Sequence, residues 1–254
     1  MGVGRKLSYA RSLLITAPLI LVYTVIMGTI SVASSIVDAR GRIQHGCSRI
    51  WAKLILWTSG IRLRVTGLEN IRPGVPYVLC ANHQSHMDTP IILAALPFQF
   101  RFTPKKQLFR YPFLGWHLRR SGHVPIDREN PHAAVKSLRE AADTIRRGTP
   151  VVIFPEGGTS RDGSIKPFKG GGFMLASKSE AQVVPVTIRG SRLVLEPKTY
   201  HVRPGVVEVI VGKPLDSQGI ATGELANRVR EEVLSTFNHG KTLDRNSYSL
   251  SRKV

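Results

Sequence analysis

The chain has 254 residues, 42% of them hydrophobic, and a formal net charge of +19 at pH 7. Its length can bury one substantial core, and its mean hydropathy near zero excludes both a disordered chain and a polytopic membrane protein. The excess of basic residues indicates an anionic partner, either nucleic acid or an acidic membrane surface and substrate. Cys47 and Cys80 are the two cysteines, and their spacing indicates neither a disulfide framework nor a zinc site.

An uncharged apolar run extends from Ser12 to Val37. Its length of about 26 residues exceeds the roughly 20 that a helix needs to cross a bilayer. Basic residues before the run and small residues at its end also fit a cleaved signal peptide, but the apolar stretch of a signal peptide is shorter. The run therefore predicts a membrane anchor. Basic residues flank it on both sides and leave its orientation open, and we expect the remainder of the chain on the cytoplasmic face.

The segment from Ile43 to Leu63 carries apolar residues at nearly helical spacing among basic ones. A helix of this kind with tryptophans on one face fits insertion at the membrane interface. Packing on the rest of the protein explains the same residues equally well, so both interpretations stay open.

Beyond residue 60, short apolar runs alternate with segments of helical period, which indicates an α/β layer structure. The expected helices are Pro131–Arg147, Gly172–Ser179 and Thr222–Phe237. The expected strands are Leu63–Thr66, Tyr77–Ala81, Arg101–Thr103, His123–Ile126, Val151–Phe154, Val183–Ile188 and Val206–Val211. We therefore expect membrane-anchoring helices over residues 1–60, one α/β domain with a mixed sheet over 61–238, and a disordered basic tail over 239–254.

A histidine and an aspartate follow the strand YVLCA directly, as His83 and Asp88. An imidazole can take a proton from a hydroxyl when it is neutral, and a nearby carboxylate fixes its tautomer and stabilises the cation that forms. The spacing predicts His83 as a general base oriented by Asp88. Alternatively, Asp88 caps the helix that begins at Thr89-Pro90 and His83 is an ordinary loop residue.

Two other interpretations of this segment are weaker. Ser85 resembles a hydrolase nucleophile, but the chain lacks the G-x-S-x-G turn that would expose it. His83 and His86 suggest a metal site, but no HExxH motif or third acidic ligand accompanies them. We expect neither a metal nor another cofactor.

Four sequence blocks resemble those of the glycerolipid acyltransferases, lysophosphatidate acyltransferases among them, in order and in spacing. The first is Asn82-His83 with Asp88, which is similar to the NHx4D motif of the family. The others are the segment from Lys105 to Trp116 with its extension to Arg128, Phe154-Pro155-Glu156-Gly157 with Ser160 to Gly163, and Val184-Pro185-Val186. The resemblance covers residues 61 to 212 and implies one mixed-sheet acyltransferase domain.

The resemblance implies transfer of a fatty acyl group from acyl-CoA or acyl-carrier protein to the sn-2 hydroxyl of 1-acylglycerol-3-phosphate, giving phosphatidate. His83 and Asp88 would be catalytic. Lysophosphatidate and anionic membrane lipids are the expected partners, and nucleic acid is not, because aromatic residues are 7% of the chain and no nucleic-acid motif is present.

One block departs from the family pattern, since Gly158-Thr159 replaces the usual Thr-Arg after Gly157. The arginine commonly assigned to the acceptor's phosphate is therefore missing from its place, and Arg161 is the nearest replacement. The remaining substrate-binding candidates are Lys105, Arg128, Glu156 and Gly157. The Gly157-Gly158 turn could supply backbone N–H groups to an oxyanion. Glu156 could alternatively hold the loops of the site.

Three further activities stay open at this stage. The acceptor can be another lysolipid, because acceptor identity varies within the family. A non-catalytic lipid-binding relative would keep the basic surface without the reaction. A thioesterase would share the donor and use water as the acceptor.

Overall fold

The computed structural model describes residues 3–38, 40–72, 74–125, 131–160 and 162–239. The described residues form one six-stranded sheet in the order β1-β6-β5-β2-β4-β3. The strands are β1 (Ile61–Thr66), β2 (Tyr77–Ala81), β3 (Arg101–Phe102), β4 (Val151–Ile153), β5 (Gln182–Arg189) and β6 (Gly205–Val211). All neighbours pair in parallel except β5 and β6, which are antiparallel. The sheet is mixed, as the sequence predicts.

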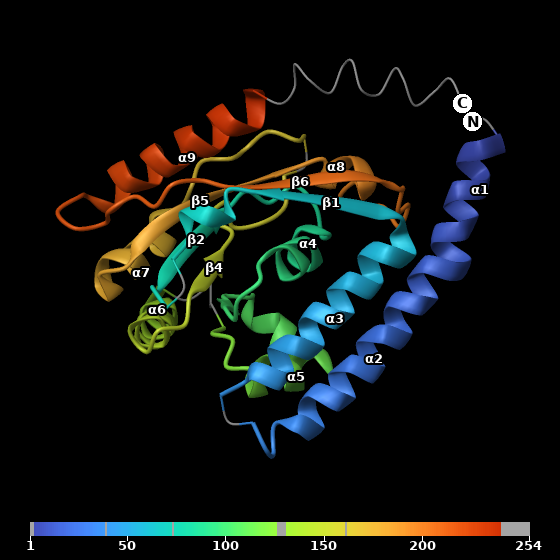
Figure 1. The fold of residues 1–254 in the computed structure, drawn as a ribbon, viewed down its shortest axis with the longest axis horizontal. Coiled ribbons are helices and arrows are strands. Elements are labelled where there is room, and N and C mark those ends of the chain that lie inside the picture. The colour runs from blue at the N-terminus through green and yellow to red at the C-terminus, as the bar shows by residue number, and fades with distance from the viewer. Residues whose placement is uncertain (1–2, 39, 73, 126–130, 161, 240–254) are drawn as a thin grey trace.

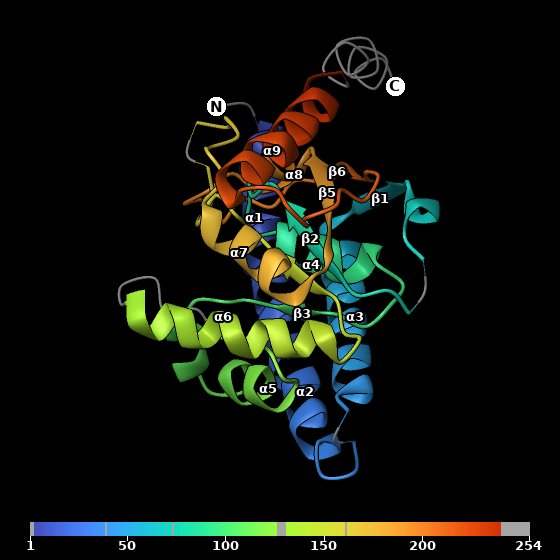
Figure 2. The ribbon, with the colours of Figure 1, turned by 90° about the vertical axis from the view of Figure 1, so that its left-hand side faces the viewer.

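Helices cover both faces of this sheet (Figures 1 and 2). One face carries α3 (Arg42–Ser59) and α4 (Asp88–Ala95), whereas the other carries α6 (Pro131–Arg146), α7 (Gly170–Ser179) and α9 (Thr222–His239). Short helices complete the connections, namely 3₁₀ turns at Leu68–Asn70 and Lys106–Arg110, α5 (Leu114–Arg120) and α8 (Ser191–Val194).

The two layers of helices explain why β2 has no polar residue. Tyr77, Leu79 and Ala81 point into the cluster that holds α3 and α4. Val78 and Cys80 point into the cluster on the opposite face. Successive side chains of a strand alternate between faces, so a strand covered on both sides is continuously apolar.

The predicted strands match the observed ones with one exception, the segment His123–Ile126. Residues 123–125 are not a strand, and Ile126 lies outside the described residues. Val124 N–H donates to the carbonyl of Phe102, but the N–H of Phe102 donates to Nδ1 of His123 at 2.8 Å. The imidazole of His123 thus takes the place of the backbone carbonyl that would accept this N–H in a β-sheet. Pro125 has no N–H with which to continue the pairing.

The N-terminal part is helical from Val3 to Ser34, as α1 (Val3–Arg11), a π-helical turn (Ser12–Thr16) and α2 (Ala17–Ser34). Helix α2 packs beside α3, as Figure 1 shows, with Tyr23 Oη 3.1 Å from Thr58 Oγ1 and Trp51 Nε1 donating to Thr24 Oγ1 at 3.0 Å. Both open interpretations of α3 find support. One face of α3 is buried, while Ile43, Ile50 and Trp57 form an exposed apolar row at seven-residue spacing.

Candidate active site

His83 and Asp88 meet at the carboxyl end of β2, where the loop after the strand turns into α4. His83 Nδ1 lies 2.8 Å from Asp88 Oδ2. The carboxylate is fully buried, whereas 16% of the His83 side chain is exposed. The structure therefore brings together the two residues that the sequence predicts as base and orienting carboxylate.

The carboxylate of Asp88 holds the loop that carries the histidine. Its Oδ2 also accepts the backbone N–H groups of Gln84 at 2.7 Å and Ser85 at 2.8 Å. The residue at the helix N-cap is Met87, and no side chain caps α4. The alternative in which Asp88 merely caps the helix is therefore wrong.

The imidazole of His83 is set for one tautomer. A carboxylate can only accept, so Nδ1 carries the hydrogen, and the neutral form of the ring has its lone pair on Nε2. Nε2 makes no hydrogen bond with any residue that the structure describes. Phe154 stacks on the ring at a centroid distance of 4.2 Å and fixes its plane. Neutral His83 can accept a proton from a ligand at Nε2.

Glu156 connects the histidine loop to the loop after β4. It is 4% exposed, and its Oε1 accepts the N–H of His83 at 2.6 Å while Oε2 accepts the N–H of Lys166 at 3.0 Å. Burial raises the pKa of Glu156, and these two backbone donors oppose that rise. Both oxygens are occupied, so this geometry favours the loop-holding role for Glu156 over substrate contact.

Asn82 fastens the end of β2 to β5. Its Oδ1 accepts the N–H of Ile188 at 2.7 Å, and its Nδ2 donates to the carbonyl of the same residue at 3.0 Å. The side-chain amide thereby continues the β2–β5 pairing by one position. The backbone of His83 starts from a fixed point as a result.

Ser85 has no geometry for nucleophilic attack. The residue is fully buried, and its hydroxyl donates to the carbonyl of Leu195 at 2.7 Å. Within the described ranges no group of three or more His, Cys, Asp or Glu residues is arranged to hold a metal ion. Neither the hydrolase nor the metal interpretation of this segment gains support.

Of the remaining predicted site residues, the structure describes Gly157 and Lys105. Gly157 has a φ of 79° and its N–H closes a turn on the carbonyl of Phe154, so this amide is not aimed at an oxyanion. Lys105 is exposed at the start of the 3₁₀ turn, and within the described part of the chain no hydrogen bond or ion pair joins it to His83 or Asp88. Arg128 and Arg161 lie outside the described residues.

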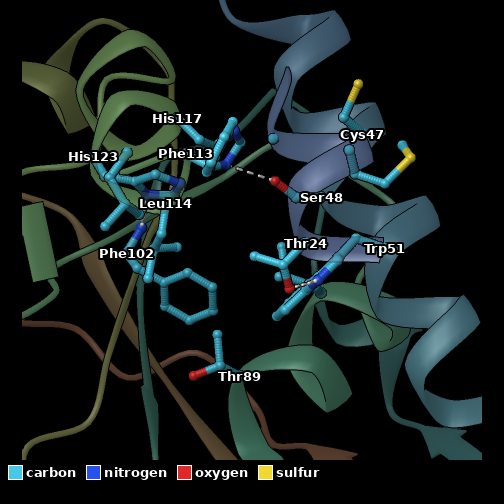
Figure 3. A pocket seen from close by; sticks show the side chains of 14 residues that line it. Thr24, Cys47, Ser48, Trp51, Thr89, Phe102, Phe113, Leu114, His117 and His123 are labelled. Atoms are coloured by element: carbon cyan, nitrogen blue, oxygen red, sulfur yellow. Dashed lines mark hydrogen bonds between the residues drawn. The ribbon is translucent and has the colours of Figure 1, made fainter. Parts of the chain in front are cut away.

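An apolar cavity lies beside the site, enclosed by residues of α2, α3, α4 and α5 (Figure 3). Its volume is about 100 Å³. Thr24 and Ser48 reach it from α2 and α3, but their hydroxyls are bonded to Trp51 and His117. The lining residues are Thr24, Met27, Gly28, Cys47, Ser48, Trp51, Thr89, Leu93, Phe102, Phe113, Leu114, His117, Leu118 and His123.

Stacked rings connect this cavity to the imidazole of His83. Phe154 stacks on His83 at 4.2 Å and on Phe102 at 6.0 Å between ring centroids. Phe102 lines the cavity, and so does Thr89, the neighbour of Asp88. The sequence pattern marked Phe154 and Phe102 as strand residues and gave no sign of this arrangement.

The chain is similar in sequence to known acyltransferases. The family model described as Acyltransferase matches residues 62–189. The chain is 30% identical to the chloroplastic 1-acyl-sn-glycerol-3-phosphate acyltransferase of Arabidopsis thaliana over 78% of this chain and 55% of that protein. It is 31% identical to a 1-acyl-sn-glycerol-3-phosphate acyltransferase of Limnanthes douglasii over 75% of this chain and 68% of that one. The chain thus spans little more than half the length of the chloroplast relative.

A solved structure has the same fold. The 1-acyl-sn-glycerophosphate (LPA) acyltransferase PlsC from Thermotoga maritima superposes with a TM-score of 0.82 at 28% sequence identity. The match covers 93% of this chain and 98% of that one.

Proposed function

The chain belongs to the acyltransferase family, and from this premise we propose that it transfers a fatty acyl group from acyl-CoA or acyl-carrier protein to the sn-2 hydroxyl of 1-acylglycerol-3-phosphate. The product would be phosphatidate. The observation that carries the proposal is the His83–Asp88 pair, whose imidazole is connected through the ring of Phe154 to Phe102 in the wall of an apolar cavity. The names of the similar proteins support the acceptor.

In the proposed reaction, His83 is the general base. Its Nε2 takes the proton of the sn-2 hydroxyl as the oxygen attacks the thioester carbonyl, and Asp88 stabilises the imidazolium. The tetrahedral intermediate then expels the thiolate, which takes the proton back from Nε2. One C–O bond forms, one C–S bond breaks, and the histidine returns to its neutral state. No acyl-enzyme is required.

The apolar cavity supports an acyl substrate for this reaction. Paired hydroxyls leave mainly carbon atoms on its wall, and such a surface suits a hydrocarbon chain. A chain bound there would present its carbonyl group near the stacked rings of Phe154 and His83. We infer that one acyl chain of the reacting pair occupies this cavity during transfer.

The N-terminal helices supply the proposed membrane attachment. One helix, Lys6–Ser34, is long and apolar enough to cross a membrane, and almost none of its most apolar stretch is buried inside the protein. The hydrogen bonds from α2 to α3 argue that this segment stays with the enzyme. The exposed row of Ile43, Ile50 and Trp57 on α3 would enter the same apolar layer, with the basic body on anionic lipids of the cytoplasmic face.

The activity is tested with purified full-length protein in mixed micelles. The donors are labelled acyl-CoA and acyl-carrier protein, and the acceptors are lysophosphatidate, glycerol 3-phosphate and uncharged or zwitterionic lysolipids. Labelled phosphatidate from lysophosphatidate is the expected product. Free fatty acid alone would indicate a thioesterase, and binding without turnover of any acceptor would indicate a non-catalytic relative.

The attachment is tested separately by sedimentation. We expect the protein to remain with the membrane fraction at about 1 M salt, where attraction between surface charges is screened. Complete release at that salt concentration would reduce the helices to a peripheral contact.

A further inference from the structure

A lysine lies against the turn in which this chain departs from its family. The Nζ of Lys166 donates to the carbonyl of Thr159 at 2.8 Å. The residue is partly buried in the loop between β4 and α7. A positive charge is therefore present in space next to the position where the sequence block lacks its arginine.

The backbone of Lys166 is fixed on two sides. Its N–H donates to Glu156 Oε2 at 3.0 Å, and its carbonyl accepts from Arg230 Nε at 3.1 Å. Arg230 also holds the carbonyl of the preceding residue, Ile165, at 3.0 Å. The ammonium group thus extends from a rigid base, and less conformational entropy is lost when it binds a ligand.

The same contacts tie Lys166 to His83. Glu156 binds the N–H of His83 with one oxygen and that of Lys166 with the other. Ser160, directly after Thr159, donates its N–H to the carbonyl of His83 at 2.9 Å. The backbones of His83 and Lys166 are consequently held next to each other by one carboxylate and one turn.

The ammonium group retains capacity for an anion. It has three N–H donors, and Thr159 takes one of them. In the described ranges no carboxylate forms an ion pair with it. The charge of Lys166 also lowers the pKa of Glu156, and two of its N–H donors are available beside the site.

We propose that Lys166 binds the phosphate of the acceptor and makes the enzyme selective for phosphorylated lysolipids. This inference rests on the proposed acyl transfer. In 1-acylglycerol-3-phosphate the phosphorylated carbon is the neighbour of the carbon that bears the reacting hydroxyl. A base at that hydroxyl therefore requires its phosphate-binding cation nearby, and Lys166 provides a point charge held through the same carboxylate as the base.

The test compares Lys166→Gln, Lys166→Met and Lys166→Arg with the wild type. Glutamine can keep the hydrogen bond to Thr159 without the charge, methionine removes both, and arginine keeps the charge. Lys178→Met, an exposed lysine on α7, is the matched control. The readouts are kcat and KM for lysophosphatidate, for monoacylglycerol and for the acyl donor, with thermal unfolding of each variant.

Both neutral variants should raise the KM for lysophosphatidate by roughly 10- to 150-fold with little change in kcat, since a charge-assisted contact made equally in ground and transition states affects binding. The KM of the donor and turnover of monoacylglycerol should not move, Lys166→Arg should recover most of the loss, and Lys178→Met should equal the wild type.

Several outcomes would overturn the inference. A Lys166→Gln enzyme with the wild-type KM for lysophosphatidate would mean that the charge is not used, and Arg161, Lys105 or Arg128 would take its place. An equal loss with monoacylglycerol would make Lys166 structural. A wild-type protein that acylates no lysolipid would instead contradict the proposed function itself.

Discussion

His83 and His117 lie in two regions of the molecule that use an imidazole differently. In the loop after β2, His83 gives one nitrogen to the buried carboxylate of Asp88. At the junction of α2, α3 and α5, His117 has Nδ1 2.5 Å from Ser31 Oγ and Nε2 2.9 Å from Ser48 Oγ. The first ring has a carboxylate on one side only, and the second has hydroxyls on both sides.

The charges around the two rings differ in sign. In the proposed reaction, Asp88 would stabilise the cation that forms on His83. Burial, followed by the positive charge of Arg101, lowers the pKa of His117 to about 4. His117 therefore stays neutral and joins three helices. Partners, rather than residue type, decide which histidine can be a base.

Two more histidines belong to the second region. Burial and then the charge of Arg101 lower the pKa of His45 to about 4, and burial places that of His123 well below its ordinary value. The rings of His117 and His123 are 6.0 Å apart. Arg101, also buried, donates to the carbonyls of Arg40 and Phe100. No carboxylate is hydrogen-bonded to these imidazoles in the described residues.

The largest expected effect comes from breaking the first region. His83→Ala should lower kcat by about 10²- to 10⁴-fold, because a positioned general base contributes that much. Asp88→Asn should cost nearly as much, since the imidazolium loses its stabilising charge. Steady-state kinetics measure both, and thermal unfolding verifies the fold. A folded His83→Ala enzyme with turnover near the wild-type value would rule out the mechanism.

The second largest effect should be a loss of stability at acid pH, caused by the buried histidines around His117. Below pH 6.5 His45 and His117 bind protons in the unfolded chain but stay neutral in the folded state. The free energy of unfolding therefore decreases as the pH is lowered. Each group should contribute a slope of up to about 1.4 kcal/mol per pH unit as pH drops from 6.5 toward 4. Denaturant unfolding in detergent between pH 7 and 4.5 measures this slope. A flat profile would show that these rings are already protonated in the fold.

His117→Leu should sharpen the comparison with a smaller effect. It leaves the buried hydroxyl of Ser31 without its partner, at an expected loss of about 1–3 kcal/mol in the free energy of unfolding. It should also reduce the slope of the free energy of unfolding against pH, because one titrating ring is gone. His86→Leu, at an exposed position, is the control and should change neither quantity.

Ser48→Ala is expected to have the smallest effect. Its hydroxyl bonds His117 and donates to the carbonyl of Gln44 at 3.1 Å, and when it is lost the hydroxyl of Ser121 remains 3.3 Å from Nε2 of His117. We expect about 1 kcal/mol of destabilisation. A larger loss than for His117→Leu would mean that Ser48, rather than the ring, organises the junction.

Residues close together in sequence made part of the site predictable. His83 and Asp88 are five positions apart at the end of an apolar strand, and local spacing alone suggests that they can meet. The strands β2, β4 and β5 were also predictable, since a strand covered on both faces is a continuous apolar run. The segment His123–Ile126 was not, because its pairing is broken by a side chain that accepts a backbone N–H.

The sequence by itself determined the α/β class, the apolar N-terminal helix and the histidine-aspartate pair, because each depends on hydrophobic period or on neighbours in the chain. Only the tertiary structure decided that Glu156 joins the loops of His83 and Lys166, that α2, α3 and α5 enclose a cavity, and that His117 is a structural residue. These features depend on the parallel register of β2 beside β4 and on helix packing, which bring together side chains from segments that a local pattern cannot relate.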